Sequence, residues 1–224
     1  MPAQGALLDE PARAHPERVK GARDPAQTSA AILAAAVHEF SQKGYGGARI
    51  NEIAKRAGAN KRMIYHYFGG KEALYLAALE CVYASIRSAE AELQLAARDP
   101  IEAIGELTRF TWRYFLAHPE FLSLLATENL HKARHLRRST RILEMHSPLV
   151  ATLADVLDRG AAEGRLRSGV DPVRVYITIA SLGFFYLTNR HTLSAIFQRD
   201  LAGARELEDW GEHIAEVVLA SLRP

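Results

Sequence analysis

Apolar side chains recur at intervals of three and four residues along most of the chain from Thr28 onward. The first such stripe consists of Ile32, Leu33, Ala36, Val37 and Phe40, and Gly44 follows it. This spacing matches the 3.6-residue period of an amphipathic α-helix, and a glycine commonly ends a helix. No stretch of the sequence alternates apolar and polar residues as a half-buried strand would. The pattern therefore predicts an all-α protein.

Two short helical patterns come next, separated by a turn of only a few residues. In residues 50–57 the apolar positions are Ile50, Ile53, Ala54 and Ala57. Gly58 ends this pattern, and Asn60, a residue type that often caps helix N-termini, precedes the next one. Two short helices joined by a tight turn with glycine are typical of the helix-turn-helix, whose second helix lies in the DNA major groove.

The second of these short helices carries an unusual set of side chains. Ile64 and Phe68 are one turn apart, so both can face the preceding helices. The outer face and the ends are then left with Lys61, Arg62, Met63, Tyr65, His66 and Tyr67. Cations and histidine can reach phosphates or base edges, and tyrosine hydroxyls can donate hydrogen bonds to phosphates. A helix that only filled a core would not expose this set.

Lys71 is a separate indication of phosphate binding. Gly69 and Gly70 end the preceding helix, and Lys71 lies in the first turn of the next one. A cation in that position opposes the helix dipole. A phosphate held jointly by the free N–H groups and by Lys71 would remove the conflict, whereas the alternative is a surface lysine without a function.

The small net charge of +2 conceals a difference between the two parts of the chain. Residues 1–71 hold 11 Lys and Arg against 6 Asp and Glu, and residues 72–224 hold 17 against 20. The basic excess therefore belongs to the first third, which favours an acidic polymer as its partner.

Residues 1–26 are rich in Pro, Ala, Gly and Arg and have no apolar period, which predicts a disordered basic arm. Its cations could touch nucleic acid, or they could be solvated beside the acidic residues of the same segment. The single cysteine, Cys81, excludes an internal disulfide, and no apolar run is long enough for a signal peptide or a membrane span. We expect a cytoplasmic protein that does not bind membranes.

In residues 73–224 the apolar spacing predicts longer helices, and the indications of function are weaker. One long helix is expected from Lys71 to about Arg98, and a later one is expected to break at Pro148. Polar residues among apolar ones are candidates for binding a small effector: Trp112, Tyr114, Glu128, Asn129, His131, Asn189, Arg190 and His191. The same residues could instead bond one another or cap helices. If Arg190 or His191 lines a cavity, a small carboxylate of an aromatic compound would suit it.

Two other classes of protein are considered. His131 and His135 are four residues apart and could share a metal, which would allow a helical metal-dependent enzyme. However, no third ligand is evident, and Lys132 and Arg134 disfavour a bound cation. Phosphate-cradling glycine loops and Ser-His-Asp spacing are also absent from the sequence, so we expect no enzyme, catalytic residue, metal or cofactor. The second alternative is a DNA-binding protein that is indifferent to sequence.

The segment GARINEIAKRAGANKRMIYHYFGGKEAL resembles the DNA-binding half of the TetR family of bacterial transcriptional regulators. The shared features are Gly44-Tyr45, Ile53-Ala54, Ala57-Gly58, Tyr65-His66-Tyr67-Phe68 and Lys71-Glu72-Ala73-Leu74. The resemblance covers about residues 28–74, and many fixed spacings agree at once. One departure is Ala48-Arg49, where the family commonly has two threonines.

The resemblance implies roles for individual residues. Base edges would be faced by Asn51, Lys61, Arg62, Met63 and His66. Phosphates would be bound by Arg49, Tyr65, Tyr67 and Lys71, with Asn60 at the start of the same surface. The last two long helices would form a four-helix dimer interface, for which we expect Tyr176, Ala180, Gly183, Phe184, Trp210, Ile214, Val217 and Val218. The alternative is that both helices complete the core of one subunit.

The sequence thus predicts three parts: a disordered basic arm at 1–26, a helix-turn-helix domain at 27–72 and a helical effector-binding and dimerisation domain at 73–224. We expect a ligand-responsive regulator, a repressor released from a palindromic double-stranded DNA operator by an effector.

Overall fold

The computed structural model describes residues 24–224, and this part of the chain is helical without strands. Its helices are α1 (Pro25–Gly47), α2 (Ile50–Ala57), α3 (Lys61–Phe68), α4 (Lys71–Ala91), α5 (Pro100–Ala117), α6 (Pro119–Leu130), α7 (Thr140–Ala162), α8 (Pro172–Phe197) and α9 (Ala204–Ser221). Two short 3₁₀ turns are η1 (Leu95–Ala97) and η2 (Leu136–Arg138). The prediction of an all-α fold with an N-terminal helix-turn-helix is confirmed.

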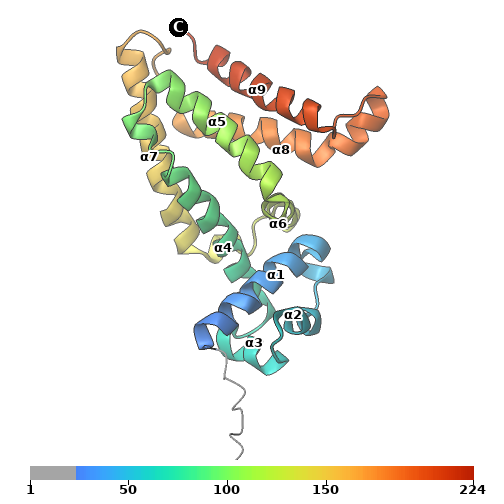
Figure 1. The fold of residues 1–224 in the computed structure, drawn as a ribbon. Coiled ribbons are helices and arrows are strands. Elements are labelled where there is room, and N and C mark those ends of the chain that lie inside the picture. Colours follow the sequence, from blue (N-terminus) through green and yellow to red (C-terminus); the bar gives the residue numbers. More distant parts are fainter. Residues whose placement is uncertain (1–23) are drawn as a thin grey trace, which may run out of the picture.

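The helices form two groups that α4 connects. Figure 1 shows α1, α2 and α3 together at one end, while α5, α8 and α9 lie at the other end of the molecule. We call α1–α3 the N-terminal domain and α4–α9 the body. Within the body α5 packs against α9 and α8, and α7 packs against α4.

Three of the helices begin at an Asp-Pro pair. The carboxylates of Asp24, Asp99 and Asp171 each accept a hydrogen bond from a backbone N–H in the first turn, at 2.9–3.1 Å. Proline fits the first helical position because its missing N–H would have no partner there. Consequently α1 begins at Pro25, earlier than the expected Thr28. The predicted disordered arm otherwise falls on residues 1–23, outside the described residues.

Two predicted helix boundaries in the body are wrong. The long helix from Lys71 ends at Ala91, not near Arg98, and Gln94 then adopts a left-handed conformation with φ of 51°. By contrast, α7 continues through Pro148. A proline inside a helix removes one backbone hydrogen bond, and here the packing of α7 against α4, α5 and α8 compensates for that loss.

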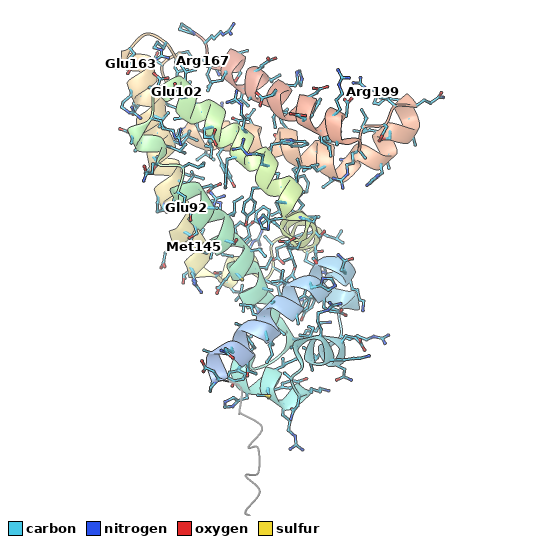
Figure 2. The ribbon with its side chains drawn as sticks, in the orientation of Figure 1. Glu92, Glu102, Met145, Glu163, Arg167 and Arg199 are labelled. Atoms are coloured by element: carbon cyan, nitrogen blue, oxygen red, sulfur yellow. The ribbon has the colours of Figure 1, made fainter. Side chains whose placement is uncertain are left out.

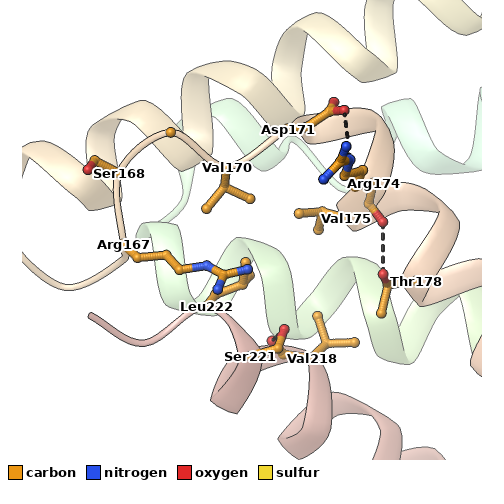
Figure 3. A pocket seen from close by; sticks show the side chains of 11 residues that line it. Arg167, Ser168, Val170, Asp171, Arg174, Val175, Thr178, Val218, Ser221 and Leu222 are labelled. Carbon is orange, nitrogen blue, oxygen red and sulfur yellow. Dashed lines mark hydrogen bonds and ion pairs between the residues drawn. The ribbon is translucent and has the colours of Figure 1, made fainter.

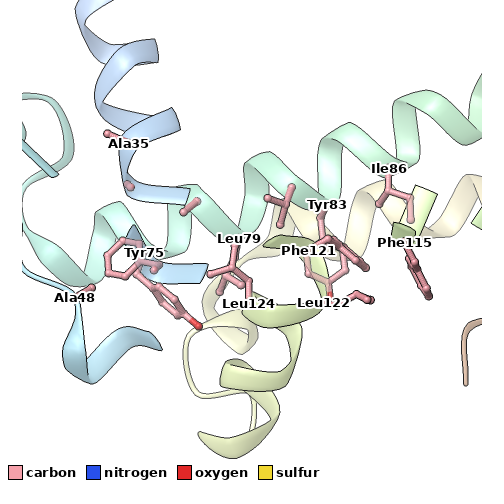
Figure 4. Packing of buried hydrophobic residues seen from close by; sticks show 14 of the residues in the cluster. Ala35, Ala48, Tyr75, Leu79, Tyr83, Ile86, Phe115, Phe121, Leu122 and Leu124 are labelled. Carbon is pink, nitrogen blue, oxygen red and sulfur yellow. The ribbon is translucent and has the colours of Figure 1, made fainter. Parts of the chain in front are cut away.

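The hydrophobic core is shared between the N-terminal domain and the body. One cluster of buried residues includes Phe40 of α1, Tyr75 and Leu79 of α4, and Leu124 of α6. Figure 4 shows α4 with Tyr75 and Leu79 directed at this region and Leu124 facing them. A second cluster, around Val156, lies farther from the N-terminal domain. Because α1 packs on both α4 and α6, a movement of either body helix acts directly on the N-terminal domain.

Candidate nucleic-acid interface

The turn between α2 and α3 is set by Gly58 and Asn60. Gly58 has a φ of 60°, the left-handed region that favours glycine, and it ends α2. Asn60 then accepts a hydrogen bond through Oδ1 from the backbone N–H of Arg62 at 2.6 Å. Asn60, predicted at the DNA surface, therefore uses its side-chain oxygen to start α3.

One buried residue fixes α3, and its polar residues face outward. Ile64 is fully buried, whereas Lys61, Arg62, Tyr65 and His66 are exposed. Met63 and Tyr67 are half-buried and pack partly against the core. Among residues 24–224 no carboxylate forms an ion pair with Lys61 or Arg62, although Lys61 Nζ lies 5.9 Å from the centre of the Tyr65 ring. The α3 surface thus carries cations that are free to meet an anionic partner.

The start of α2 depends on Glu39, a residue that no pattern in the sequence marks as functional. Glu39 is buried on α1, where its Oε1 accepts hydrogen bonds from Lys43 Nζ at 2.9 Å and from the backbone N–H of Arg49 at 3.3 Å. Burial acts to raise the pKa of Glu39, but these hydrogen bonds outweigh it and leave the pKa lowered. The Arg49 side chain and Asn51 are both exposed beside this anchor. The anchor thereby holds the backbone next to two predicted DNA ligands.

Lys71 has a partner within the protein. Its Nζ lies 4.9 Å from the centre of the Tyr45 ring, a distance at which a cation is attracted to an aromatic face. The pKa of Lys71 is lowered chiefly by burial, while the carboxylate of Glu39 acts to raise it. The helix begins without a side-chain cap at Gly70, so its first N–H groups remain open to an anion. Phosphate binding by Lys71 stays a prediction, since Tyr45 already stabilises the cation.

The predicted effector residues do not converge on one cavity. Trp112 Nε1 donates to the carbonyl of Leu207 at 3.0 Å, and the Tyr114 hydroxyl donates to Ser85 Oγ at 3.0 Å. Glu128 is fully buried and accepts hydrogen bonds from the backbone N–H groups of His135 and Leu136. The side chains of Asn129, Asn189 and Arg190 each contact a carbonyl of their own helix. His131, which follows α6, contacts the Thr127 carbonyl, while His191 is exposed. Their effector roles therefore stay predictions, with protein partners found for seven of the eight.

The predicted dimer residues occupy both sides of α8 and α9. Ile214, Val218 and Gly183 are buried inside the subunit, and the Tyr176 hydroxyl accepts a hydrogen bond from Arg87 of the same chain. Half-buried positions are Ala180, Phe184 and Trp210, all packed against the subunit's core. Val217, in contrast, is 38% exposed. Residues already buried in one subunit, as Ile214, Val218 and Gly183 are, add little contact with a second, but the dimer roles of all eight residues stay predictions.

An apolar stripe not predicted from the sequence lies on the exposed side of α8. Val173, Ile177 and Phe185 are exposed at intervals of four and eight residues, which places them on one helix face. Sequence periodicity did not separate this face because α8 is apolar around most of its circumference.

Comparison with known proteins agrees with this geometry. Residues 32–78 match the family described as bacterial regulatory proteins, tetR family, and residues 100–218 match the tetracyclin repressor-like C-terminal domain. The chain belongs to the TetR family. It is accordingly a DNA-binding transcriptional regulator rather than an enzyme, and the resemblance noted in the sequence is confirmed. Proteins of this family bind DNA operators and small-molecule effectors and act as dimers.

Two individual relatives and one solved structure match most of this chain. The HTH-type transcriptional repressor NicS of Pseudomonas putida is 44% identical over 86% of this chain and 91% of its own length. The HTH-type transcriptional regulator RutR of Escherichia coli is 27% identical over 87% of this chain and 90% of its own. A solved structure, the putative transcriptional regulator SCO4942 of Streptomyces coelicolor, superposes with a TM-score of 0.66 at 25% identity, covering 88% of this chain and 99% of that one.

The described residues offer neither a metal site nor a membrane helix. Within 24–224, no three His, Cys, Asp or Glu residues are grouped so that they could hold a metal ion. His135, one of the two histidines considered as ligands, places Nδ1 3.0 Å from Glu128 Oε2. In the same range none of the helices combines the length and apolar character that crossing a bilayer requires.

Proposed function

We propose that this regulator is a cytoplasmic repressor that binds a palindromic operator as a homodimer and leaves it when an effector binds in the body. The observation that carries the proposal is α3, which is anchored by Ile64 and presents Lys61 and Arg62 without a carboxylate partner among residues 24–224. Two relatives, NicS and SCO4008 of Streptomyces coelicolor, are named as repressors, and this favours repression over activation.

The contacts divide into those that select sequence and those that hold the backbone. Base edges are met by Asn51, Lys61, Arg62, Met63 and His66, of which Arg62 is suited to guanine O6 and N7. Phosphates are met by Arg49, Tyr65, Tyr67 and Lys71. Asn60 contributes by fixing the first turn of α3, because its Oδ1 accepts a hydrogen bond from the Arg62 backbone N–H.

Dimerisation uses the exposed apolar surface of α8 and α9. The stripe of Val173, Ile177 and Phe185, together with Val217 of α9, is exposed in the single chain. Exposed apolar side chains of this kind are expected to be covered, and a two-fold pairing lets the same surface cover itself. Such a dimer presents two α3 helices to successive major grooves, which are about 34 Å apart.

Release from DNA follows from the position of α4. This helix begins at Lys71, directly after α3, and ends at Ala91 inside the body. An effector that binds more tightly to a dimer with misplaced α3 helices shifts the equilibrium toward free protein. A coupling free energy of about 1–3 kcal/mol or more is needed for a useful response.

Selection of random duplexes on the purified protein tests the DNA-binding part. With the selected duplex, Arg62→Ala should weaken binding by about 1–3 kcal/mol and relax the preference at one base pair. Tyr67→Phe should weaken binding to all sequences alike, because phosphates carry no base identity. Arg205→Ala is the matched control, since Arg205 is an exposed arginine on α9.

Two results would contradict the proposal. Normal operator binding by a variant with Arg62, Tyr67 and Lys71 all changed to alanine would show that α3 is not the DNA-binding surface. Equal affinity for selected and random duplexes would favour the sequence-indifferent DNA-binding protein.

A further inference from the structure

A cavity of about 270 Å³ lies between α4 and α7, near η1. Its walls are largely apolar and include Leu95, Met145, Leu149 and Thr152. Figure 2 shows Met145 on α7, the helix that packs against α4. Two charged residues of α4, Arg87 and Glu90, line the same cavity.

Arg87 and Glu90 are buried but lack most of the hydrogen bonds that buried charges require. Their side chains are 7% and 2% exposed. Arg87 Nη2 donates to the Tyr176 hydroxyl at 3.1 Å and lies 2.9 Å from Glu90 Oε1. In the part of the chain that the structure describes, Arg87 Nε and Nη1 have no hydrogen-bond partner, and neither carboxylate oxygen of Glu90 accepts a hydrogen bond. Buried polar groups without partners are costly, so these atoms are suited to a bound molecule.

The charge of this group is positive when Glu90 carries a proton. Burial raises the pKa of Glu90 to about 7, although Arg87 acts to lower it. Burial and the charge of Arg87 lower the pKa of His146, although the hydrogen bond with the Ile142 carbonyl acts to raise it. His146 is therefore neutral at pH 7. When Glu90 is protonated, Arg87 is a buried cation without a neutralising carboxylate. The group can then accept one negative charge and become neutral overall.

We propose that this cavity binds a small monocarboxylate, with the carboxylate on the free N–H groups of Arg87 and the apolar part against Leu95, Met145 and Leu149. A dianion would leave one charge uncompensated in the buried site, and a cation would be repelled by the guanidinium. The assignment of this ligand as the effector rests on the function proposed above, whereas the binding site itself does not.

The position of Arg87 on α4 connects the cavity with the DNA-binding end of the molecule. Arg87 is 16 residues after Lys71 on α4, a rise of about 24 Å along one continuous helix. The guanidinium also holds α8 through Tyr176. A carboxylate that draws Arg87 toward the cavity therefore acts on α4 and α8 together.

Another cavity, of about 350 Å³, lies where the start of α8 meets the end of α9 (Figure 3). Its Arg174 is 87% exposed and lies 3.6 Å from the carboxylate of Asp171. A solvated, paired arginine has no unsatisfied donors to offer, so this cavity lacks the feature that distinguishes the one at Arg87.

Calorimetric titration of the full-length protein with benzoate, in the absence of DNA, tests the site. We expect saturable binding of benzoate and binding of benzamide, which has the same shape without the charge, weaker by about thirty-fold or more. Arg87→Gln should lose a similar factor, while Arg113→Gln, at an exposed arginine of α5, should bind as the original protein does.

A second variant protects the test against misfolding. Thr152→Phe fills the cavity from α7 while leaving the Arg87 guanidinium in place, and it should also abolish benzoate binding. The proposal is overturned if the original protein fails to bind benzoate, or if both variants bind it normally.

Proton uptake provides an independent measurement. Because the carboxylate favours protonated Glu90, benzoate affinity should fall as pH rises from 6 to 8, and Glu90→Gln should remove this dependence. The other titratable groups facing the pair are Tyr83, Tyr114, His146 and Tyr176. Burial raises the pKa of the three tyrosines, which stay neutral over this range, and burial lowers the pKa of His146. A pH-independent affinity in the original protein would contradict the charge assignment.

A parallel assay with the selected operator separates the two proposals. Operator binding by a protein that ignores benzoate would overturn this site and leave the repressor function standing. Benzoate binding that does not release the operator would support the site and overturn its role as the effector site.

Discussion

Glu128 should act as an internal cap rather than as an effector ligand. It lies on α6, fully buried, and its Oε1 accepts hydrogen bonds from the backbone N–H groups of His135 at 2.7 Å and Leu136 at 2.9 Å. Its Oε2 lies 3.0 Å from His135 Nδ1. The carboxylate therefore holds the segment between α6 and η2, next to Tyr45 of the N-terminal domain, whose ring centre is 4.7 Å from that of His135.

The substitution Glu128→Ala should lower the free energy of unfolding by about 3–5 kcal/mol. Each of the two backbone N–H groups left buried without a partner costs about 1–3 kcal/mol, and the missing side chain leaves a cavity. For a chain of this size the melting temperature falls by about 2–4 °C per kcal/mol, so we expect a decrease of about 10 °C. Glu128→Gln keeps one accepting oxygen and should lose less.

Thermal and urea unfolding followed by circular dichroism would measure this loss. Glu216→Ala is a suitable control, because Glu216 is exposed on α9 and the same atoms are removed there. A melting temperature of Glu128→Ala within 2 °C of the original would refute the role as an internal cap. If, in addition, operator release by the effector changed, Glu128 would be the effector ligand that the sequence predicted.

The pH dependence of stability gives a further test of the same group. Burial acts to raise the pKa of Glu128, but hydrogen bonds from Leu136 and His135 outweigh it, so the pKa in the folded state lies below the ordinary value of 4.5. A lowered folded pKa means that the stabilisation is complete above the unfolded pKa and is lost as pH falls through the folded value. The loss of stability on acidification should therefore be smaller in Glu128→Ala than in the original protein.

Three further changes test other parts of the structure. Gly211→Ala would place a Cβ 2.5 Å from Trp112 Cδ1, and this overpacking should lower the free energy of unfolding, measured with urea, by about 1–3 kcal/mol. An unchanged urea midpoint would contradict the close approach of α9 to α5. Phe185→Glu puts a charge on the exposed apolar stripe of α8 and should give monomers in analytical ultracentrifugation; a stable dimer would exclude this surface as the interface. Lys71→Ala should reduce the salt dependence of operator binding by about one unit of slope if Lys71 binds a phosphate, and an unchanged slope would show that its contact with Tyr45 does not extend to DNA.

Local signals in the sequence were sufficient for the helix-turn-helix. The ends of α2 and α3 depend on Gly58 and Asn60, whose effects operate within two or three residues of chain. The outward surface of α3 was also predictable, since Ile64 is the apolar anchor and the helix is only two turns long. Where a boundary depended on packing between helices, as at Pro148, the sequence led to the wrong expectation.

The uses of charged residues in the body required the tertiary structure. Arg87 and Glu90 are three residues apart on a helix, a spacing that in sequence is typical of a solvated surface pair. The packing of α7 and α8 against α4 buries them, and Tyr176, 89 residues away from Arg87, supplies a hydrogen bond. Glu39 and Glu128 likewise gain their partners from backbone N–H groups in other segments.

The sequence by itself determined which segments become helices and which short helix presents exposed cations, because capping, periodicity and the charge of side chains are properties of neighbouring residues. The tertiary structure alone decided which side of α8 remains exposed and which charged side chains are buried. Both outcomes depend on contacts between helices that are distant in the sequence, and α8, apolar on nearly every side, carries no local signal that selects one face.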